Sequence, residues 1–238
     1  MILLNIITKI YHNIHIVVNI VSIIIWLDFI KGIRYDKIKK HKEATDMESK
    51  WLEEEVAKLG LEEYIGLGDI PDLDLYMDQL ITLFESKLSH TKRYEGDKLL
   101  TKTMINNYTK DKVLMPAHKK KYTKDHIILM ILLYHLKGII SIGDIKDLFS
   151  SLKIDENLDS HKLANFYEAY LACRDKELSY FNFGIEKRIE MVNEEMEKMQ
   201  IQDEKVGAML LVCTLIEQAT YHKRLAEHII DKCIKGEE

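Results

Sequence analysis

Long stretches without proline or glycine constrain the fold of this chain more than any other feature of its sequence. Pro71 and Pro116 are the only prolines among 238 residues, and there are only ten glycines. These two residue types interrupt helices most strongly, whereas the abundant Leu, Ile, Lys, Glu and Met residues favour them. The sequence also lacks the short β-branched runs, alternating with helices, that a parallel α/β fold requires. It therefore predicts an all-α protein.

Positive charge is concentrated in one segment. The net charge of the chain is −5, yet residues 98–124 contain eight lysines against one acid, Asp111, which gives this segment a net charge of +7. A basic segment in an otherwise acidic chain is typical of a binding site for a polyanion such as nucleic acid. A solvated charged surface explains the charge alone equally well.

Residues 101–110, inside the basic segment, are predicted to form a short helix with Thr101 as its N-cap. The helical repeat gives this helix two faces. The apolar face, which should pack inward, contains Met104, Ile105 and Tyr108. The polar face can hydrogen-bond base edges and phosphates in a major groove, and it contains Thr103, Asn106, Asn107 and Lys110. Taken alone, the pattern is also that of an ordinary amphipathic helix.

The segments after this helix follow in a specific order. Leu114-Met115-Pro116 leads into the basic turn Lys119-Lys120-Lys121-Tyr122. A strongly apolar helix is then predicted from Thr123 to Lys137, closed by Gly138. Ser141-Ile142-Gly143-Asp144 is a variant of the capping box and opens a further amphipathic helix.

This order of elements resembles the winged helix-turn-helix of MerR-type regulators. In that family a recognition helix enters the major groove, and a basic wing with an aromatic residue contacts the DNA backbone. The resemblance implies that the helix 101–110 reads bases and that residues 119–122 form the wing. Together with the neighbouring lysines, the candidate DNA-binding residues are Lys102, Thr103, Asn106, Asn107, Tyr108, Lys110, Lys112, Lys119, Lys120, Lys121 and Tyr122.

Three stretches, residues 70–79, 100–110 and 120–122, also resemble an uncharacterised bacterial family, domain of unknown function 1836, which is predicted to be MerR-like. This resemblance covers about residues 65–155. One feature differs from MerR-type proteins, in which a tight turn joins the first helix to the recognition helix. Here the first helix, expected to start at Pro71 and Asp72 and to end near Leu88, lies about a dozen residues before the second.

Residues 1–46 are first apolar and then basic. Residues 14–30 are nearly long enough to span a bilayer, and the following lysines and Arg34 would then hold the rest of the chain in the cytoplasm. The alternative is that translation starts at Met47, because residues 1–46 have the composition of translated AT-rich DNA and Lys42-Glu43-Ala44 is compatible with a ribosome-binding sequence. Both alternatives place the remainder of the protein in the cytoplasm.

The C-terminal residues 156–238 are predicted to form a helical bundle for dimerisation or regulation. Amphipathic helices are expected after Ser160, over residues 185–199 and over residues 203–234. The stretch 208–216 is apolar all round, which predicts burial on several sides. A homodimer is expected because MerR-type proteins bind two half-sites. A small-molecule effector that binds to the bundle is compatible with this organisation.

No nucleophile elbow, metalloprotease motif, phosphate loop or dinucleotide fingerprint is present in the sequence. We therefore expect no enzyme, no metal and no cofactor. The leading hypothesis is a sequence-specific transcriptional regulator that binds double-stranded DNA through residues 47–155. The alternative is a protein-binding adaptor, anchored at a membrane if residues 1–30 are genuine.

Overall fold

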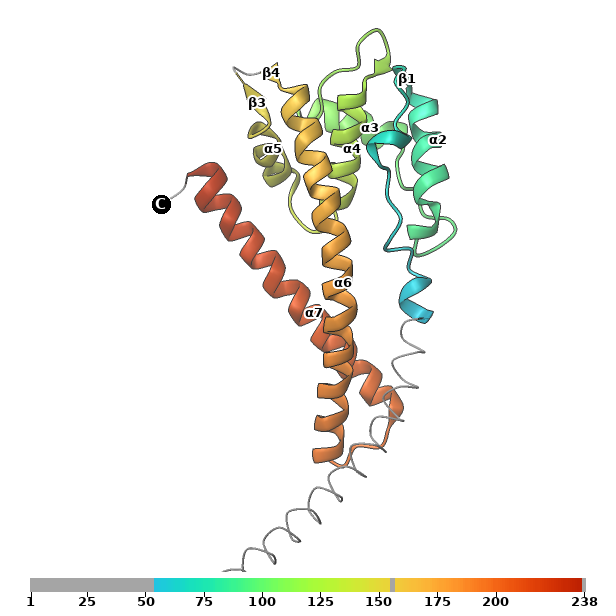
Figure 1. The fold of residues 1–238 in the computed structure, drawn as a ribbon, viewed down its shortest axis with the longest axis vertical. Helices are drawn as coiled ribbons and strands as arrows, with labels where there is room; N and C mark the ends of the chain where they lie inside the picture. Colours follow the sequence, from blue (N-terminus) through green and yellow to red (C-terminus); the bar gives the residue numbers. More distant parts are fainter. Residues whose placement is uncertain (1–53, 155–156, 237–238) are drawn as a thin grey trace, which may run out of the picture. The chain divides into compact units, whose positions relative to one another are not determined.

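The computed structural model describes residues 54–154 and 157–236, and residues 55–238 cluster into one compact unit. The predicted membrane span and the alternative start at Met47 lie outside the described residues. The described part is mostly helical, with strands of only two residues each (Figure 1), which confirms the all-α prediction. None of the helices in residues 54–154 and 157–236 is both long and apolar enough to cross a membrane.

The elements follow one another in a simple order. The first part contains η1 (Leu67–Asp69), β1 (Leu75–Tyr76), α2 (Met77–Leu88), η2 (Ser89–Thr91), α3 (Lys102–Lys110), β2 (Lys121–Tyr122), α4 (Lys124–Leu136) and α5 (Ile142–Ser150). The second part contains β3 (Lys153–Ile154), β4 (Asn157–Leu158), α6 (Ser160–Lys198), α7 (Glu204–Ile229) and η3 (Ile230–Lys235).

The helix α4 forms the centre of the core. Every residue from His126 to Leu133 is buried, as expected for a helix that is apolar on all sides. The helices α2, α3, α5 and α6 each contribute buried apolar side chains to the same cluster. Their largest fully buried members include Phe84, Ile105, Ile145 and Tyr167.

Local capping determines where two helices begin, as the sequence predicted. The Oγ1 atom of Thr101 accepts a hydrogen bond from the backbone N–H of Met104 at 3.1 Å. Ser141 accepts in the same way from the N–H of Asp144, also at 3.1 Å, and its hydroxyl donates to the Asp144 carboxylate at 2.7 Å. Both bonds satisfy backbone donors that have no partner within the helix.

The predicted start of the first helix is wrong. Pro71 and Asp72 precede the helix by several residues, and α2 begins only at Met77. The reason is the antiparallel pairing of β1 with β2, in which Leu75 lies opposite Tyr122 and Tyr76 opposite Lys121. This pairing keeps the chain extended up to Tyr76, whose backbone N–H donates to the Gln79 side chain at 2.9 Å.

The long helix α6 also fixes the segment that precedes η1. The Tyr167 hydroxyl, which is fully buried, donates to the carbonyl oxygen of Ile65 at 2.5 Å. Two turns further along α6, the Arg174 guanidinium donates to the carbonyl oxygens of Leu61 and Glu63 at 2.5 and 2.9 Å. Burial raises the pKa of Tyr167 well above its usual value, so the hydroxyl remains a donor.

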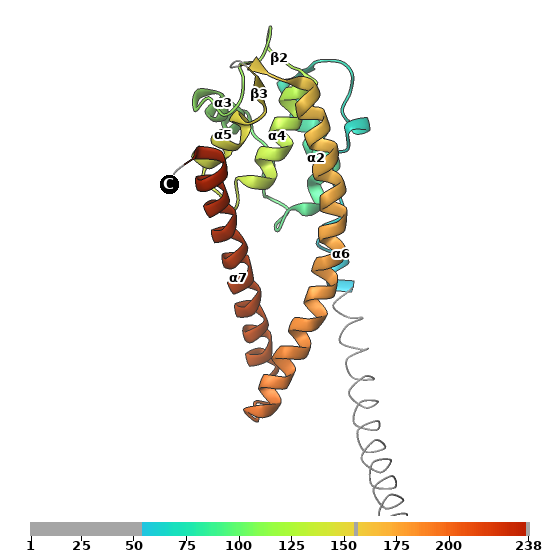
Figure 2. The ribbon, with the colours of Figure 1, turned by 60° about the vertical axis from the view of Figure 1, so that its left-hand side comes forward.

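The C-terminal residues form a pair of long helices and not a bundle. The first two predicted helices are a single helix, α6. α7 contacts α6 near the connection between them, where a Cβ on Gly207 would meet the Met196 sulfur at 2.7 Å. The two helices then diverge (Figures 1 and 2), and the far end of α7 reaches α5 through η3, where Lys235 pairs with Asp144 at 2.9 Å.

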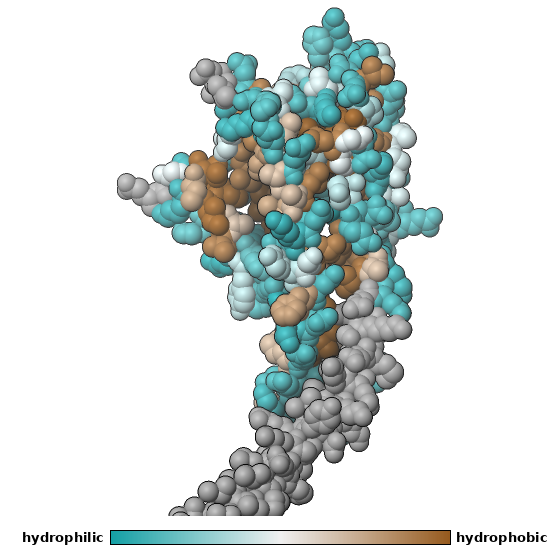
Figure 3. All heavy atoms as spheres, viewed as in Figure 1, coloured by the Kyte–Doolittle hydropathy of each residue, from teal (hydrophilic) through white to brown (hydrophobic). Residues whose placement is uncertain are grey.

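The predicted burial of residues 208–216 is wrong for the same reason. No residue of α7 is buried, and Met209, Val212 and Ile216 expose 60, 53 and 61% of their surface. A helix that diverges from its neighbour after a few turns is covered on one side only, and only over that length. Apolar side chains accordingly reach the surface on the face shown in Figure 3, including over the C-terminal part of α7.

Candidate nucleic-acid interface

The helix α3 has the two faces that its sequence predicts. Ile105 and Tyr108 are buried against the core, and Met104 is half-buried. The polar face is open to solvent, since all of Lys102, Thr103, Asn106, Asn107 and Lys110 are exposed. This face is therefore accessible to a large partner such as a DNA duplex.

The basic turn is a β-hairpin with a two-residue loop. The backbones of His118 and Lys121 exchange two hydrogen bonds, of 3.0 and 2.9 Å. The two residues between them, Lys119 and Lys120, have φ angles of 50° and 66°. Left-handed backbone at both central positions defines a type I′ turn, which favours Asn-Gly or other small residues over lysine. The sequence predicted a turn here but not its strained geometry.

Two residues that the sequence analysis missed support this surface. The Lys121 ammonium lies 5.2 Å from the centre of the Tyr76 ring, a cation–π contact across the β1–β2 ladder. The Lys102 ammonium pairs with the Asp78 carboxylate at 2.7 Å, which connects the start of α3 to the start of α2. The first contact follows from the register of β1 on β2, which no local sequence signal specifies.

A buried histidine fixes the loop between α3 and the hairpin. The Nδ1 atom of His126 accepts hydrogen bonds from the backbone N–H and the hydroxyl of Thr123, at 3.2 and 2.7 Å. Its Nε2 atom therefore has the hydrogen and donates to the carbonyl oxygen of Pro116 at 3.3 Å. His126 thus caps α4 and holds the preceding loop, while His118 remains exposed.

The local charge is smaller than the sequence count suggests. Carboxylates from outside the basic segment pair with two of its lysines, Asp78 with Lys102 and Asp72 with Lys124, the latter at 3.9 Å. Within residues 54–154 and 157–236, no carboxylate forms an ion pair with the remaining exposed lysines of this surface, which are Lys110, Lys112, Lys119 and Lys120. These four are the cations available to an anionic partner.

Two of the candidate DNA-binding residues do not belong to the exposed surface. Tyr108 and Tyr122 expose only 8 and 5% of their surface. Burial raises the pKa of both hydroxyls. Their rings pack in the core because α3 turns Tyr108 inward and the β1–β2 pairing places Tyr122 beside Leu75. We therefore correct their assignment from DNA contacts to core residues that support the surface.

Among the described residues, no group of three or more His, Cys, Asp and Glu side chains is arranged to hold a metal ion. The exposed set consists of amides, hydroxyls and ammonium groups, which can hydrogen-bond or pair with an anion but include no nucleophile–base pair.

Comparison with known proteins identifies a family match. The family model described as Domain of unknown function (DUF1836) matches residues 65–170. No curated protein and no solved structure shows significant similarity to the chain. The matched residues extend from the segment held by Tyr167 to the first turns of α6, and so include α2, α3, the hairpin, α4 and α5. The comparison supports, for residues 65–170, the family that the three sequence stretches resemble.

Proposed function

We propose that the protein is a sequence-specific DNA-binding transcriptional regulator with a MerR-like winged helix-turn-helix, acting in the cytoplasm, and not an enzyme. One observation carries the proposal: the exposed polar face of α3 is followed by a hairpin that presents two lysines without ion-pair partners among the described residues. In this assignment α3 is the recognition helix and the 118–121 hairpin is the wing.

The residue types suit these two roles. An asparagine amide can bond adenine through two hydrogen bonds, so Asn106 and Asn107 are the candidate base-reading residues. Lysines supply contacts to phosphates, which give affinity without sequence preference. The exposed Lys110, Lys112, Lys119 and Lys120 are the candidates for this role. The segment from η2 to Thr101 replaces the tight turn of MerR-type proteins.

The role of α3 is tested by changing its amides. The full-length protein is used to select binding sites from randomised duplexes at low salt, and the selected sequence is then measured by fluorescence anisotropy. We expect Asn106→Ala and Asn107→Ala each to reduce the preference for the selected sequence over random duplex by about 1–3 kcal/mol. Binding to random duplex should change little, because the phosphate contacts remain.

Asn182→Ala provides a matched control, since Asn182 is an exposed amide on α6, outside the proposed interface. It should leave both affinities unchanged. If the protein selects no sequence and binds no duplex at low salt, the regulator hypothesis is wrong, and the protein-binding adaptor becomes the better explanation.

We also propose that the regulator is a homodimer formed through α6 and α7. On α7, Leu211 and Thr214 lie on the helix face toward α6 and are partly covered. The same face continues at Tyr221 and Leu225, three or four residues apart along the helix, and there the side chains are 63 and 57% exposed. An apolar face that continues beyond the point where its covering helix diverges is suited to a second copy of the chain.

Sedimentation equilibrium of full-length variants tests this interface. Tyr221→Gln combined with Leu225→Gln should raise the dimer dissociation constant by at least about tenfold, from the apolar area lost at the interface. Met209→Gln combined with Val212→Gln removes a comparable exposed apolar area from the opposite face of α7 and should have little effect. A wild-type protein that is monomeric at micromolar concentration, or a larger effect of the second variant, would contradict the assignment.

A further inference from the structure

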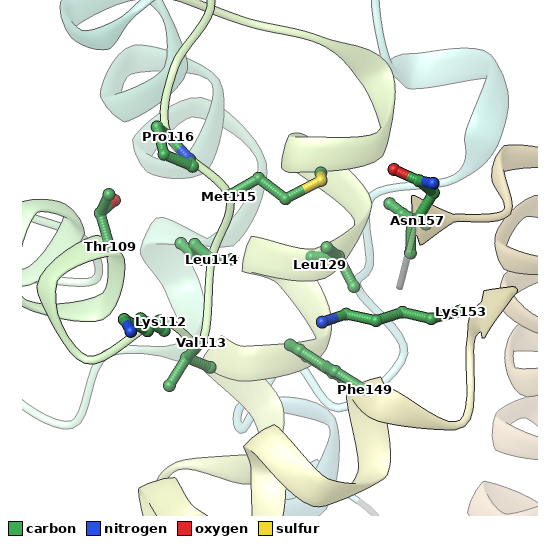
Figure 4. Close-up of a pocket in the computed structure, with 11 residues that line it drawn as sticks. Thr109, Lys112, Val113, Leu114, Met115, Pro116, Leu129, Phe149, Lys153 and Asn157 are labelled. Carbon is green, nitrogen blue, oxygen red and sulfur yellow. The ribbon is translucent and has the colours of Figure 1, made fainter. Parts of the chain in front are cut away.

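A pocket of about 350 Å³ lies behind the proposed interface (Figure 4). Its walls come from the end of α3 and the loop after it, from α4, from α5 and from the β3–β4 hairpin. The floor is apolar and belongs to the core, since Leu114, Leu129 and Phe149 are all buried. Met115 adds a half-buried thioether at one side.

Two lysines give the rim of the pocket a positive charge. Figure 4 shows Lys153 extending from β3 across the pocket, between Phe149 and Leu129, while Lys112 lines the opposite wall. Neither ammonium forms an ion pair with a carboxylate of residues 54–154 or 157–236. A cation placed over an apolar floor without a carboxylate partner is complementary to an anion that has an apolar body.

We infer that this pocket binds a small organic anion with an apolar body, such as an aromatic carboxylate. Inorganic phosphate or a DNA phosphate would leave the apolar floor uncovered, and an uncharged apolar compound would form no ion pair with Lys153. The volume is at the lower end of the range for small-molecule sites, which limits the ligand to about one or two rings.

The position of the pocket gives such a ligand a route to the DNA-binding surface. One wall, residues 112–116, is the segment that joins α3 to the 118–121 hairpin, and Thr109 in the last turn of α3 also lines the pocket. A bound ligand would therefore contact the segment that determines the position of the 118–121 hairpin relative to α3. This consequence rests on the proposed function, whereas the ligand site itself does not, and the following test uses no DNA.

Two fluorescent probes separate the charge from the apolar body. Anilinonaphthalene sulfonate has an aromatic body and one anionic group, and N-phenyl-naphthylamine has the same body without the charge. In the full-length protein, Lys153→Gln should weaken sulfonate binding by about threefold to fivefold, the upper part of the range for one exposed ion pair. The binding of the neutral probe should not change. Lys176→Gln, which removes an exposed lysine from α6, is the control and should affect neither.

Methionine methyl groups locate the bound probe. With isotope-labelled methionine methyls, the sulfonate probe should shift the NMR signal of Met115, which is assigned through Met115→Leu. The methyls of Met191, Met199 and Met209 report the exposed apolar surfaces of α6 and α7. Shifts confined to these three, an absence of sulfonate binding, or a Lys153→Gln variant that binds the sulfonate as tightly as wild type would each overturn the inference.

Discussion

Replacing Lys119 with Asn and Lys120 with Gly is expected to stabilise the fold and, at the same time, to weaken binding to duplex DNA of any sequence. Both lysines have left-handed backbone, with φ angles of 50° and 66°. This conformation costs an L-residue with a side chain roughly 1–2 kcal/mol, and Asn-Gly is the pair that type I′ turns favour. Glycine loses more conformational entropy on folding than lysine, which offsets part of this gain. The free energy of unfolding should therefore rise by about 1–2 kcal/mol.

The expected loss of DNA affinity has a separate cause. Each lysine that contacts a phosphate adds about 0.9 to the slope of log affinity against log salt concentration. Removal of both should lower that slope by about 2, and at roughly 0.1 M salt this amounts to a loss on the order of 50-fold in affinity. Anisotropy titrations at several salt concentrations measure the slope, and denaturant unfolding measures the stability.

Matched variants keep the two effects apart. Lys119→Arg with Lys120→Arg retains both charges and the left-handed backbone, so stability and salt slope should remain those of the wild type. Lys176→Gln with Lys205→Gln removes the same charge from exposed positions on α6 and α7 and should leave the slope unchanged. A hairpin variant that is more stable and binds DNA as tightly as wild type would remove the wing from the proposed mechanism.

The second large effect expected concerns acid. Between about pH 6.5 and pH 4, the protein should lose about 3 kcal/mol of stability through one side chain, His135. This imidazole is largely buried on α4, beside the rings of Tyr134 and Tyr170, with the Arg174 guanidinium nearby. Burial first, and then the charge of Arg174, lower the pKa of His135 from 6.5 to about 4.

The sign follows from proton uptake. As the pH falls below 6.5 the unfolded chain binds a proton at His135, whereas the folded protein does so only near pH 4, so stability decreases throughout this window. Above pH 6.5 the histidine is neutral in both states and contributes no pH dependence. The pKa values of Asp69 and Asp144 are lowered by hydrogen bonds, chiefly from Lys87 and Lys235, so their contribution is lost at lower pH.

Denaturant unfolding at closely spaced pH values measures this effect. His135→Gln, which cannot titrate, should be less sensitive to pH between 6.5 and 4 than the wild type by about the same 3 kcal/mol. His222→Gln changes an exposed histidine on α7 and serves as the control, with the wild-type pH dependence retained. If the wild type and His135→Gln lose stability in parallel over this range, the buried-histidine explanation is wrong.

The sequence by itself determined the features whose causes lie within a few residues of one another. Thr101 and Ser141 cap their helices by accepting a hydrogen bond from the backbone N–H three residues later. The capping residue and the group that it caps therefore lie within one helical turn of each other. The apolar run of α4 predicted a core helix for a similar reason, because a helix without a polar face has to be enclosed. The polar face of α3 follows from the helical repeat alone.

Only the tertiary structure decided the features that depend on distant partners. The pairing of Leu75 with Tyr122 delayed the start of α2 and buried a tyrosine that the sequence assigned to DNA. Asp72 and Asp78 form ion pairs with Lys124 and Lys102, which are distant from them in the sequence. The exposure of α7 likewise depends on where α6 diverges from it. Apolar composition indicates that a helix face should be buried, but it does not indicate which other element buries it. Contacts between distant segments depend on the free energy of the whole fold.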